Sequence, residues 1–154
     1  MTVRVLVADD SLTVRRHMVQ VLAAEPGIQV IGEASDGNEA VDLCRRLRPD
    51  VVTLDILMPG IDGVAATERI MAYMPTPILV VCATSRGEVA GSFAALAAGA
   101  VEVLEKPHGD VGDGPWEQRL VDLVRLVARV RVLTHVRGRR DHGDPTGAHP
   151  HLQP

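Results

Sequence analysis

Five short apolar runs punctuate this chain of 154 residues, and polar or glycine-containing segments separate them. The runs consist mainly of valine, isoleucine and leucine, as is typical of strands that are buried on both faces of a parallel sheet. We therefore predict strands at residues 3–8, 28–34, 51–54, 78–82 and 101–104.

The segments between these runs predict helices, because their apolar positions recur at three- and four-residue spacing. Ser11 or Thr13 caps the first helix. The second helix is expected after a turn at residues 35–38. Further helices are expected at residues 64–73, at 89–98 and from 116 to about 136. Five alternations of strand and helix predict an α/β fold, with a doubly wound parallel sheet covered by helices on both faces.

The composition predicts a soluble domain with an aliphatic core, since 46% of the residues are hydrophobic and only 2% are aromatic. The formal charge of −4 is mild and favours no class of partner. Cys44 and Cys82 form no C-x-x-C pair and suggest a reducing compartment. No apolar run approaches the length of a membrane span, and the first residues lack a signal-peptide pattern. We expect a cytoplasmic protein with no membrane partner.

Charged residues follow three of the predicted strands. Asp9 and Asp10 come after the first strand, Asp55 after the third and Lys106 after the fifth. The carboxyl ends of parallel strands share one edge of the sheet, where ligands bind in such folds. Three carboxylates that meet there would repel one another unless a hard cation such as Mg²⁺ joined them. With the lysine they supply what phosphoryl transfer needs, and an aspartate can itself be the nucleophile.

Three motifs carry a resemblance to a known family. They are the pair Asp9-Asp10, the run D-I-L-M-P-G-I-D-G at residues 55–63, and Lys106-Pro107. This set resembles the response-regulator receiver domain of two-component signalling, over residues 2 to about 129. The resemblance implies a flavodoxin-like sheet with strand order 2-1-3-4-5 and the sequential elements predicted above.

The same resemblance implies a role for each charged residue. Asp55 would be the phosphoacceptor, and histidine-kinase phosphohistidines would be the donors. Asp10, Asp55 and the backbone carbonyl of Leu57 would bind Mg²⁺, with Asp9 acting through a water molecule. Lys106 would pair with the phosphoryl group. The output of such a switch is the binding of a protein partner.

Two positions depart from the family pattern. The family has a threonine or serine at the end of the fourth strand. Counting forward from Pro77 places Cys82 there, whereas counting back from Lys106 places Thr84 there. The second departure is Val103, at a switch position where the family often has an aromatic residue.

Among receivers, the chain looks most like the regulatory domain of chemotaxis protein-glutamate methylesterases. The segments that carry this likeness are P-I-L-V-V-C-A-T-S-R-G-E, G-A-V-E-V-L-E-K-P and R-V-R-V-L-T-H-V-R. No G-x-S-x-G nucleophile motif is present in the sequence. We therefore expect either a stand-alone regulator without enzymatic turnover, in chemotaxis-type signalling, or the regulatory fragment of a methylesterase.

Other interpretations are weaker. A Mg²⁺-dependent aspartyl-phosphate hydrolase would need a second acid where Leu57 stands. Arginines at residues 116–140 resemble a nucleic-acid contact, but no helix-turn-helix follows, so we expect no nucleic-acid partner. His142, His149 and His151 belong to a segment without apolar periodicity, which predicts a disordered tail at residues 138–154 rather than a metal site.

The last predicted helix is longer than a receiver needs. The apolar positions expected to cover the sheet are Leu120, Leu123, Val124, Val127 and Val130. A second set on another face is Leu126, Val132, Leu133 and Val136. We interpret residues 1–129 as the receiver and 130–137 as a helix extension or linker that binds a second copy or another protein. We also expect a cis peptide bond before Pro107.

Overall fold

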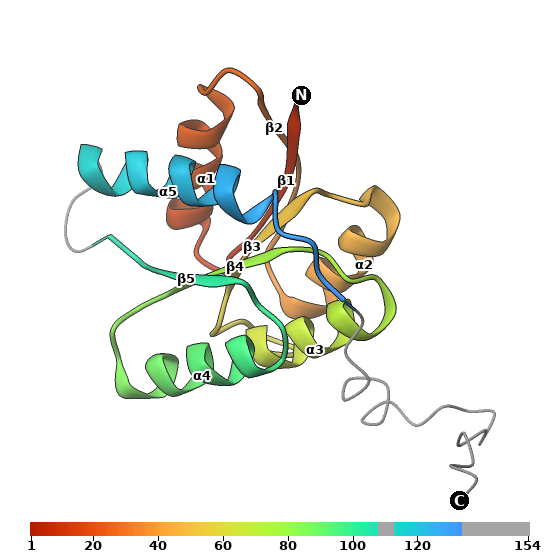
Figure 1. Ribbon diagram of the computed structural model, residues 1–154. Helices are drawn as coiled ribbons and strands as arrows, with labels where there is room; N and C mark the ends of the chain where they lie inside the picture. Colours follow the sequence, from red (N-terminus) through yellow and green to blue (C-terminus); the bar gives the residue numbers. More distant parts are fainter. Residues whose placement is uncertain (108–112, 134–154) are drawn as a thin grey trace, which may run out of the picture.

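The computed structural model describes residues 1–107 and 113–133 and contains a single five-stranded sheet (Figure 1). Its strands are β1 (Val3–Ala8), β2 (Ile28–Ala34), β3 (Val51–Asp55), β4 (Ile78–Cys82) and β5 (Glu102–Glu105). They lie in the order β2-β1-β3-β4-β5, and every neighbouring pair is parallel. The predicted fold class and strand order are confirmed.

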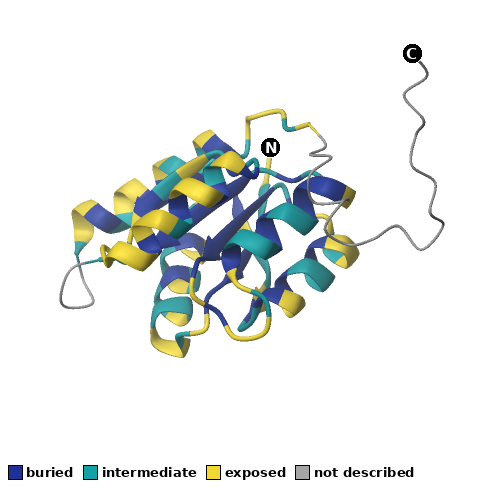
Figure 2. Ribbon diagram, turned by 90° about the horizontal axis from the view of Figure 1, so that it is seen from below, coloured by how far each residue is buried: buried dark blue, intermediate teal, exposed yellow. Residues whose placement is uncertain are grey.

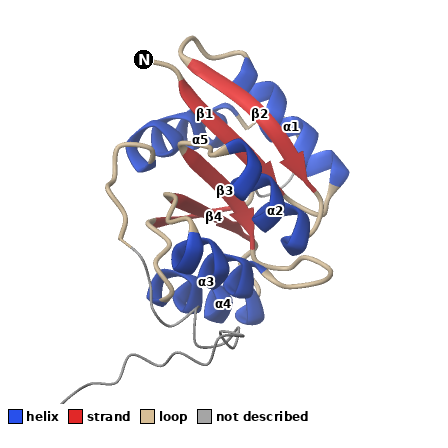
Figure 3. Ribbon diagram, turned by 90° about the vertical axis from the view of Figure 1, so that its right-hand side faces the viewer, coloured by secondary structure: helices blue, strands red, loops and turns tan. Residues whose placement is uncertain are grey.

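Helices cover both faces of the sheet (Figure 3). They are α1 (Leu12–Ala23), α2 (Gly37–Leu47), α3 (Gly63–Tyr73), α4 (Arg86–Ala97) and α5 (Gly114–Val127). Helices α1 and α5 lie on one face, and α2, α3 and α4 lie on the other (Figure 1). Side chains alternate along each strand, so β1 sends Val5 and Val7 to the α1/α5 layer and Leu6 to the opposite one.

Burial follows this layering (Figure 2). The central strands β1, β3 and β4 are mainly buried, whereas the edge strands β2 and β5 and the outer faces of the helices are partly or fully exposed. All five residues of β3 and of β4 are buried, which explains why these strands read as continuous apolar runs. None of the helices in the described part of the chain combines the length and apolarity that a membrane span requires.

The side chains expected to cap helices do so. Ser11 accepts a hydrogen bond from the backbone N–H of Val14 at the start of α1, at 3.3 Å. Helix α4 begins earlier than predicted, at Arg86, because Ser85 caps it by accepting from Glu88 N–H. Residues 86–88, which precede the predicted helix at 89–98, therefore form the first turn of α4.

Helix α5 is shorter than predicted. It ends at Val127, and the N–H of Val130 bonds to the Val127 carbonyl at 3.0 Å in a closing turn. Val132 then packs against the core of the opposite face, whereas the Leu133 side chain is 77% exposed. The prediction of a helix that continues to about residue 136 is therefore wrong for residues 128–133, where the chain turns back toward the domain. The alternative, that a linker starts at residue 130, stays a prediction. Residues 134–136 and the tail at 138–154 lie outside the described residues.

Candidate functional site

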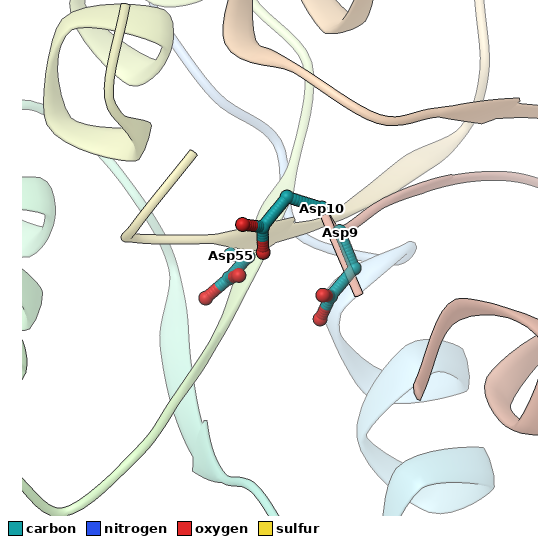
Figure 4. Close-up of side chains that lie close together, drawn as sticks. All are labelled: Asp9, Asp10 and Asp55. Atoms are coloured by element: carbon teal, nitrogen blue, oxygen red, sulfur yellow. The ribbon is translucent and has the colours of Figure 1, made fainter. Parts of the chain in front are cut away.

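The predicted acids meet at the carboxyl edge of the sheet. Asp55 is the last residue of β3, and Asp9 follows β1, where its N–H bonds to the Ala34 carbonyl at 3.0 Å. One carboxylate oxygen from each of Asp9, Asp10 and Asp55 lies within 4.8 Å of the others. The three side chains converge in Figure 4, with Asp10 extending toward Asp55. Asp10 is exposed, whereas the other two carboxylates are buried.

Lys106 reaches the same cluster from β5. Its Nζ lies 3.1 Å from Asp55 Oδ2 and 3.4 Å from Asp9 Oδ2. Burial acts to lower the pKa of Lys106, but the Asp9 and Asp55 carboxylates outweigh it and raise that pKa above its ordinary value. The ammonium is therefore a permanent positive charge at this edge of the sheet.

The peptide before Pro107 is not cis, since no peptide bond in the described ranges is. The prediction of a cis bond there is wrong. Lys106 still faces the acids because its backbone continues the pairing of β5, with its N–H donating to the Cys82 carbonyl at 2.8 Å. The length of the lysine side chain then spans the remaining distance to the carboxylates.

Burial dominates the titration of the acids. It raises the pKa of Asp55 to about 7, with Asp9 adding to the shift and Lys106 opposing it. Burial also raises the pKa of Asp9, although the N–H of Ser11 donates to Asp9 Oδ1 at 2.9 Å and opposes the shift. A site that disfavours its own negative charge in this way gains from any additional cation.

The donor set fits Mg²⁺. Both carboxylate oxygens of Asp55 are buried and have no hydrogen-bond partner within the described residues, beyond the Lys106 ion pair. Mg²⁺ takes oxygen ligands and binds through one or two carboxylates, which Asp10 and Asp55 supply, with Asp9 behind them. Leu57 lies two residues after Asp55 with its side chain 57% exposed, in the loop expected to contribute a carbonyl.

Buried side chains and hydrogen bonds hold the loop between β3 and α3 in place. Ile56 and Met58 are buried, and Gly60 takes a φ of 79°, a conformation that glycine adopts readily. The N–H of Gly63 bonds to the Ile56 carbonyl at 2.8 Å, and Asp62 caps α3. The Met-Pro-Gly turn thus leaves the end of β3 fixed next to the start of α3.

Cys82 and Thr84 differ in their placement. Cys82 ends β4 and is 3% exposed, with its carbonyl bound by Lys106 N–H. Burial raises the pKa of its thiol. Thr84 lies beyond the strand and is exposed. Val103 lies in β5, partly buried against the core beneath α2, α3 and α4. The strand-end position is therefore occupied by a thiol.

Two contacts near the site were not anticipated from the sequence. Arg15 in α1 donates from Nη1 to the Asp9 carbonyl at 2.8 Å. Trp116 in α5 donates from its indole nitrogen to the Glu105 carbonyl at 2.6 Å, next to Lys106. Each contact joins a helix to the end of a strand. No sequence pattern predicts which arginine or tryptophan of an amphipathic helix makes such a contact.

Thr53 lies two residues before Asp55, and its buried hydroxyl has no partner in the described part of the chain. We expect Thr53→Val to raise the free energy of unfolding by about 1 kcal/mol, because it removes an unpaired polar group from an apolar site. Urea unfolding would measure this. The control is Thr67→Val, which should destabilise, since the Thr67 hydroxyl donates to the Gly63 carbonyl at 2.7 Å. Equal losses in both variants would contradict the assignment.

Comparison with known proteins agrees with this geometry. The family model "Response regulator receiver domain" matches residues 5–111. A protein-glutamate methylesterase/protein-glutamine glutaminase of Anaeromyxobacter dehalogenans is 47% identical over 146 residues, which are 95% of this chain and 42% of that protein. One of Geobacter metallireducens is 48% identical over 135 residues, covering 85% of this chain and 39% of that protein.

Solved structures extend the likeness. The response regulator domain of Thermotoga maritima CheB matches with a TM-score of 0.78 and 35% identity, covering 85% of this chain and 99% of that one. The chain spans less than half the length of the methylesterases just described. The chain therefore belongs to the response-regulator receiver domain family, and its receiver is of the chemotaxis methylesterase type.

Proposed function

We propose that Asp55 accepts a phosphoryl group from a histidine-kinase phosphohistidine, and that this switches the binding of a protein partner in chemotaxis-type signalling in the cytoplasm. The observation that carries the proposal is the placement of the Lys106 ammonium within 3.4 Å of oxygens of both Asp55 and Asp9. A phosphoryl group on Asp55 would meet a fixed positive charge there.

The chemistry requires little else from the chain. An Asp55 carboxylate oxygen attacks phosphorus, the P–N bond of the donor breaks, and its electron pair returns to the imidazole. Lys106 exchanges part of its contact with the carboxylates for the phosphoryl oxygens. Mg²⁺, held by Asp10, Asp55 and the Leu57 carbonyl with Asp9 behind, would neutralise charge on the transferring group. The Cys82 thiol at the end of β4, a weak donor, would offer less to that group than a hydroxyl does. Hydrolysis would reset the switch: water attacks phosphorus, the P–O bond to Asp55 breaks, and inorganic phosphate and the Asp55 carboxylate are released.

A second candidate is that the chain is the regulatory part of a methylesterase. Coverage of only 42% and 39% of two such relatives favours it. In that case the partner would be a catalytic domain, and the switch would act on it. Both candidates share the same phosphorylation step, and in neither does the receiver itself turn over a further substrate.

The expected partners are proteins: the kinase that donates the phosphoryl group, and an output partner or a second copy. With α5 ending at Val127, binding at the C-terminal segment would rest on the exposed Leu126 and Leu133 rather than on a helical strip. Light scattering on the full chain and on a chain cut after Arg129 would test this. A monomer in both, with unchanged partner binding, would reject it.

We expect Asp55→Asn to abolish phosphorylation completely, because an amide cannot form the acyl phosphate. The measurement is the intact mass after incubation with a small phosphodonor and Mg²⁺. Asp42→Asn is the control, since Asp42 is a partly exposed acid on α2 that pairs with Arg45 away from the site, and this variant should keep the mass increase. Stoichiometric phosphate on folded Asp55→Asn protein would show that the nucleophile is another residue.

A further inference from the structure

Arg15 connects α1 to the turn that carries the acids. Its side chain is 14% exposed, and its Nη1 donates to the Asp9 carbonyl at 2.8 Å. Its Nε pairs with Glu33 Oε1 at 3.1 Å, and Glu33 lies on β2. Glu33 on β2 thus orients the guanidinium of Arg15 toward the Asp9–Asp10 peptide, which follows β1.

This contact completes the hydrogen bonding of Asp9. The Asp9 N–H already bonds to the Ala34 carbonyl, and its Oδ1 accepts from Ser11 N–H. Its Oδ2 pairs with Lys106. The carbonyl is then its remaining polar group, and it belongs to the same planar peptide as the N–H of Asp10. Because that peptide is planar, an arginine that fixes the direction of the Asp9 carbonyl also fixes the position of the Asp10 Cα, from which the side chain extends.

Asp10 depends on such support more than its neighbours do. It is the exposed member of the acid cluster, whereas Asp9 and Asp55 are held by burial and by Lys106. We infer that Arg15 is a positioning residue that orients the Asp9–Asp10 peptide and so holds the Asp10 carboxylate ready for a divalent cation. This inference rests on the proposed function, in which that cation is Mg²⁺.

The charge of Arg15 gives the test a definite sign. A guanidinium near a cation site repels the cation, so electrostatics alone predicts tighter Mg²⁺ binding when Arg15 is removed. Loss of positioning predicts the opposite. Arg16 is the matched control, because it is the next residue on α1, carries the same charge and is exposed.

The experiment titrates Mg²⁺ into the full chain and follows binding by calorimetry, with thermal unfolding in the absence of Mg²⁺ recorded for each variant. We expect Arg15→Ala to weaken Mg²⁺ binding about tenfold, as the loss of groups that orient metal ligands does elsewhere. Arg16→Ala should bind Mg²⁺ as the wild type does or slightly more tightly. Arg15→Lys, which can reach the carbonyl without also pairing with Glu33, should fall between.

Unchanged or tighter Mg²⁺ binding in folded Arg15→Ala protein would overturn the inference. If Arg15→Ala does not fold, Glu33→Ala replaces it. This variant keeps the arginine but removes the acceptor that orients it, and unaltered Mg²⁺ affinity would equally overturn the inference. Failure of the proposed function is separate, because wild-type protein would then bind Mg²⁺ and show no phosphate by mass.

Discussion

Replacing Gly63 with alanine should lower the free energy of unfolding by about 3 kcal/mol, at the upper end of what overpacking costs, and should abolish phosphorylation. Gly63 is the first residue of α3 and lies directly against the end of β3. An added Cβ would overlap the Asp55 carbonyl oxygen and lie 2.8 Å from the Ile56 Cα. Because these atoms belong to the backbone, the overlap is relieved only if α3 or the end of β3, which carries the predicted phosphoacceptor Asp55, moves.

Gly87→Ala is the matched control. Gly87 lies in the first turn of α4, and a Cβ there would meet nothing within 4 Å. Alanine at such a helical position is expected to stabilise by up to about 1 kcal/mol. Urea unfolding and phosphate uptake by mass would be measured for both variants. If Gly63→Ala were as stable and as active as Gly87→Ala, α3 would not pack against the end of β3 as closely as described.

The arrangement of the site was predictable because two simple rules apply to it. Buried strands of a parallel sheet need continuous apolar runs, and the residues after such runs must share one edge. These rules bring Asp9, Asp55 and Lys106 together without any knowledge of side-chain packing. The roles of Asp55, Asp10 and Lys106 in phosphoryl transfer remain predictions that the experiments above test.

What the pattern did not predict depends on tertiary contacts. Apolar residues continue past Val127 at helical spacing, but Val132 is partly buried after a turn back to the other face of the sheet instead. Periodicity does not distinguish these two outcomes. Likewise, the sequence pattern did not show where β4 ends. It ends at Cys82, whose carbonyl accepts a hydrogen bond from Lys106 N–H, and whether Cys82 or Thr84 contacts the phosphoryl group stays a prediction. No pattern in the sequence singled out Arg15.

Without divalent cations, wild-type protein should lose stability relative to Asp55→Asn as the pH rises from about 4 to about 7. The folded-state pKa of Asp55 is raised to about 7, mainly by burial and then by Asp9. An unfolded aspartate titrates near 3.9, so between these values the folded protein holds a proton that the unfolded chain has released. Stability conferred by that proton is fully present below about pH 4 and is lost as the pH passes about 7.

Urea unfolding of both proteins at pH 4.5 and pH 8 in EDTA would measure the effect. The two should be similarly stable at the lower pH, and Asp55→Asn should exceed the wild type by on the order of 2–4 kcal/mol at the higher one. Adding Mg²⁺ at pH 8 should raise the free energy of unfolding of the wild type more than that of Asp55→Asn, because the cation compensates the charge of the ionised Asp55 carboxylate. A difference between the proteins that is constant with pH would show that Asp55 ionises normally in the folded state. The Asp55 carboxylate would then need no cation to offset its burial, and electrostatics would not favour Mg²⁺ at this site.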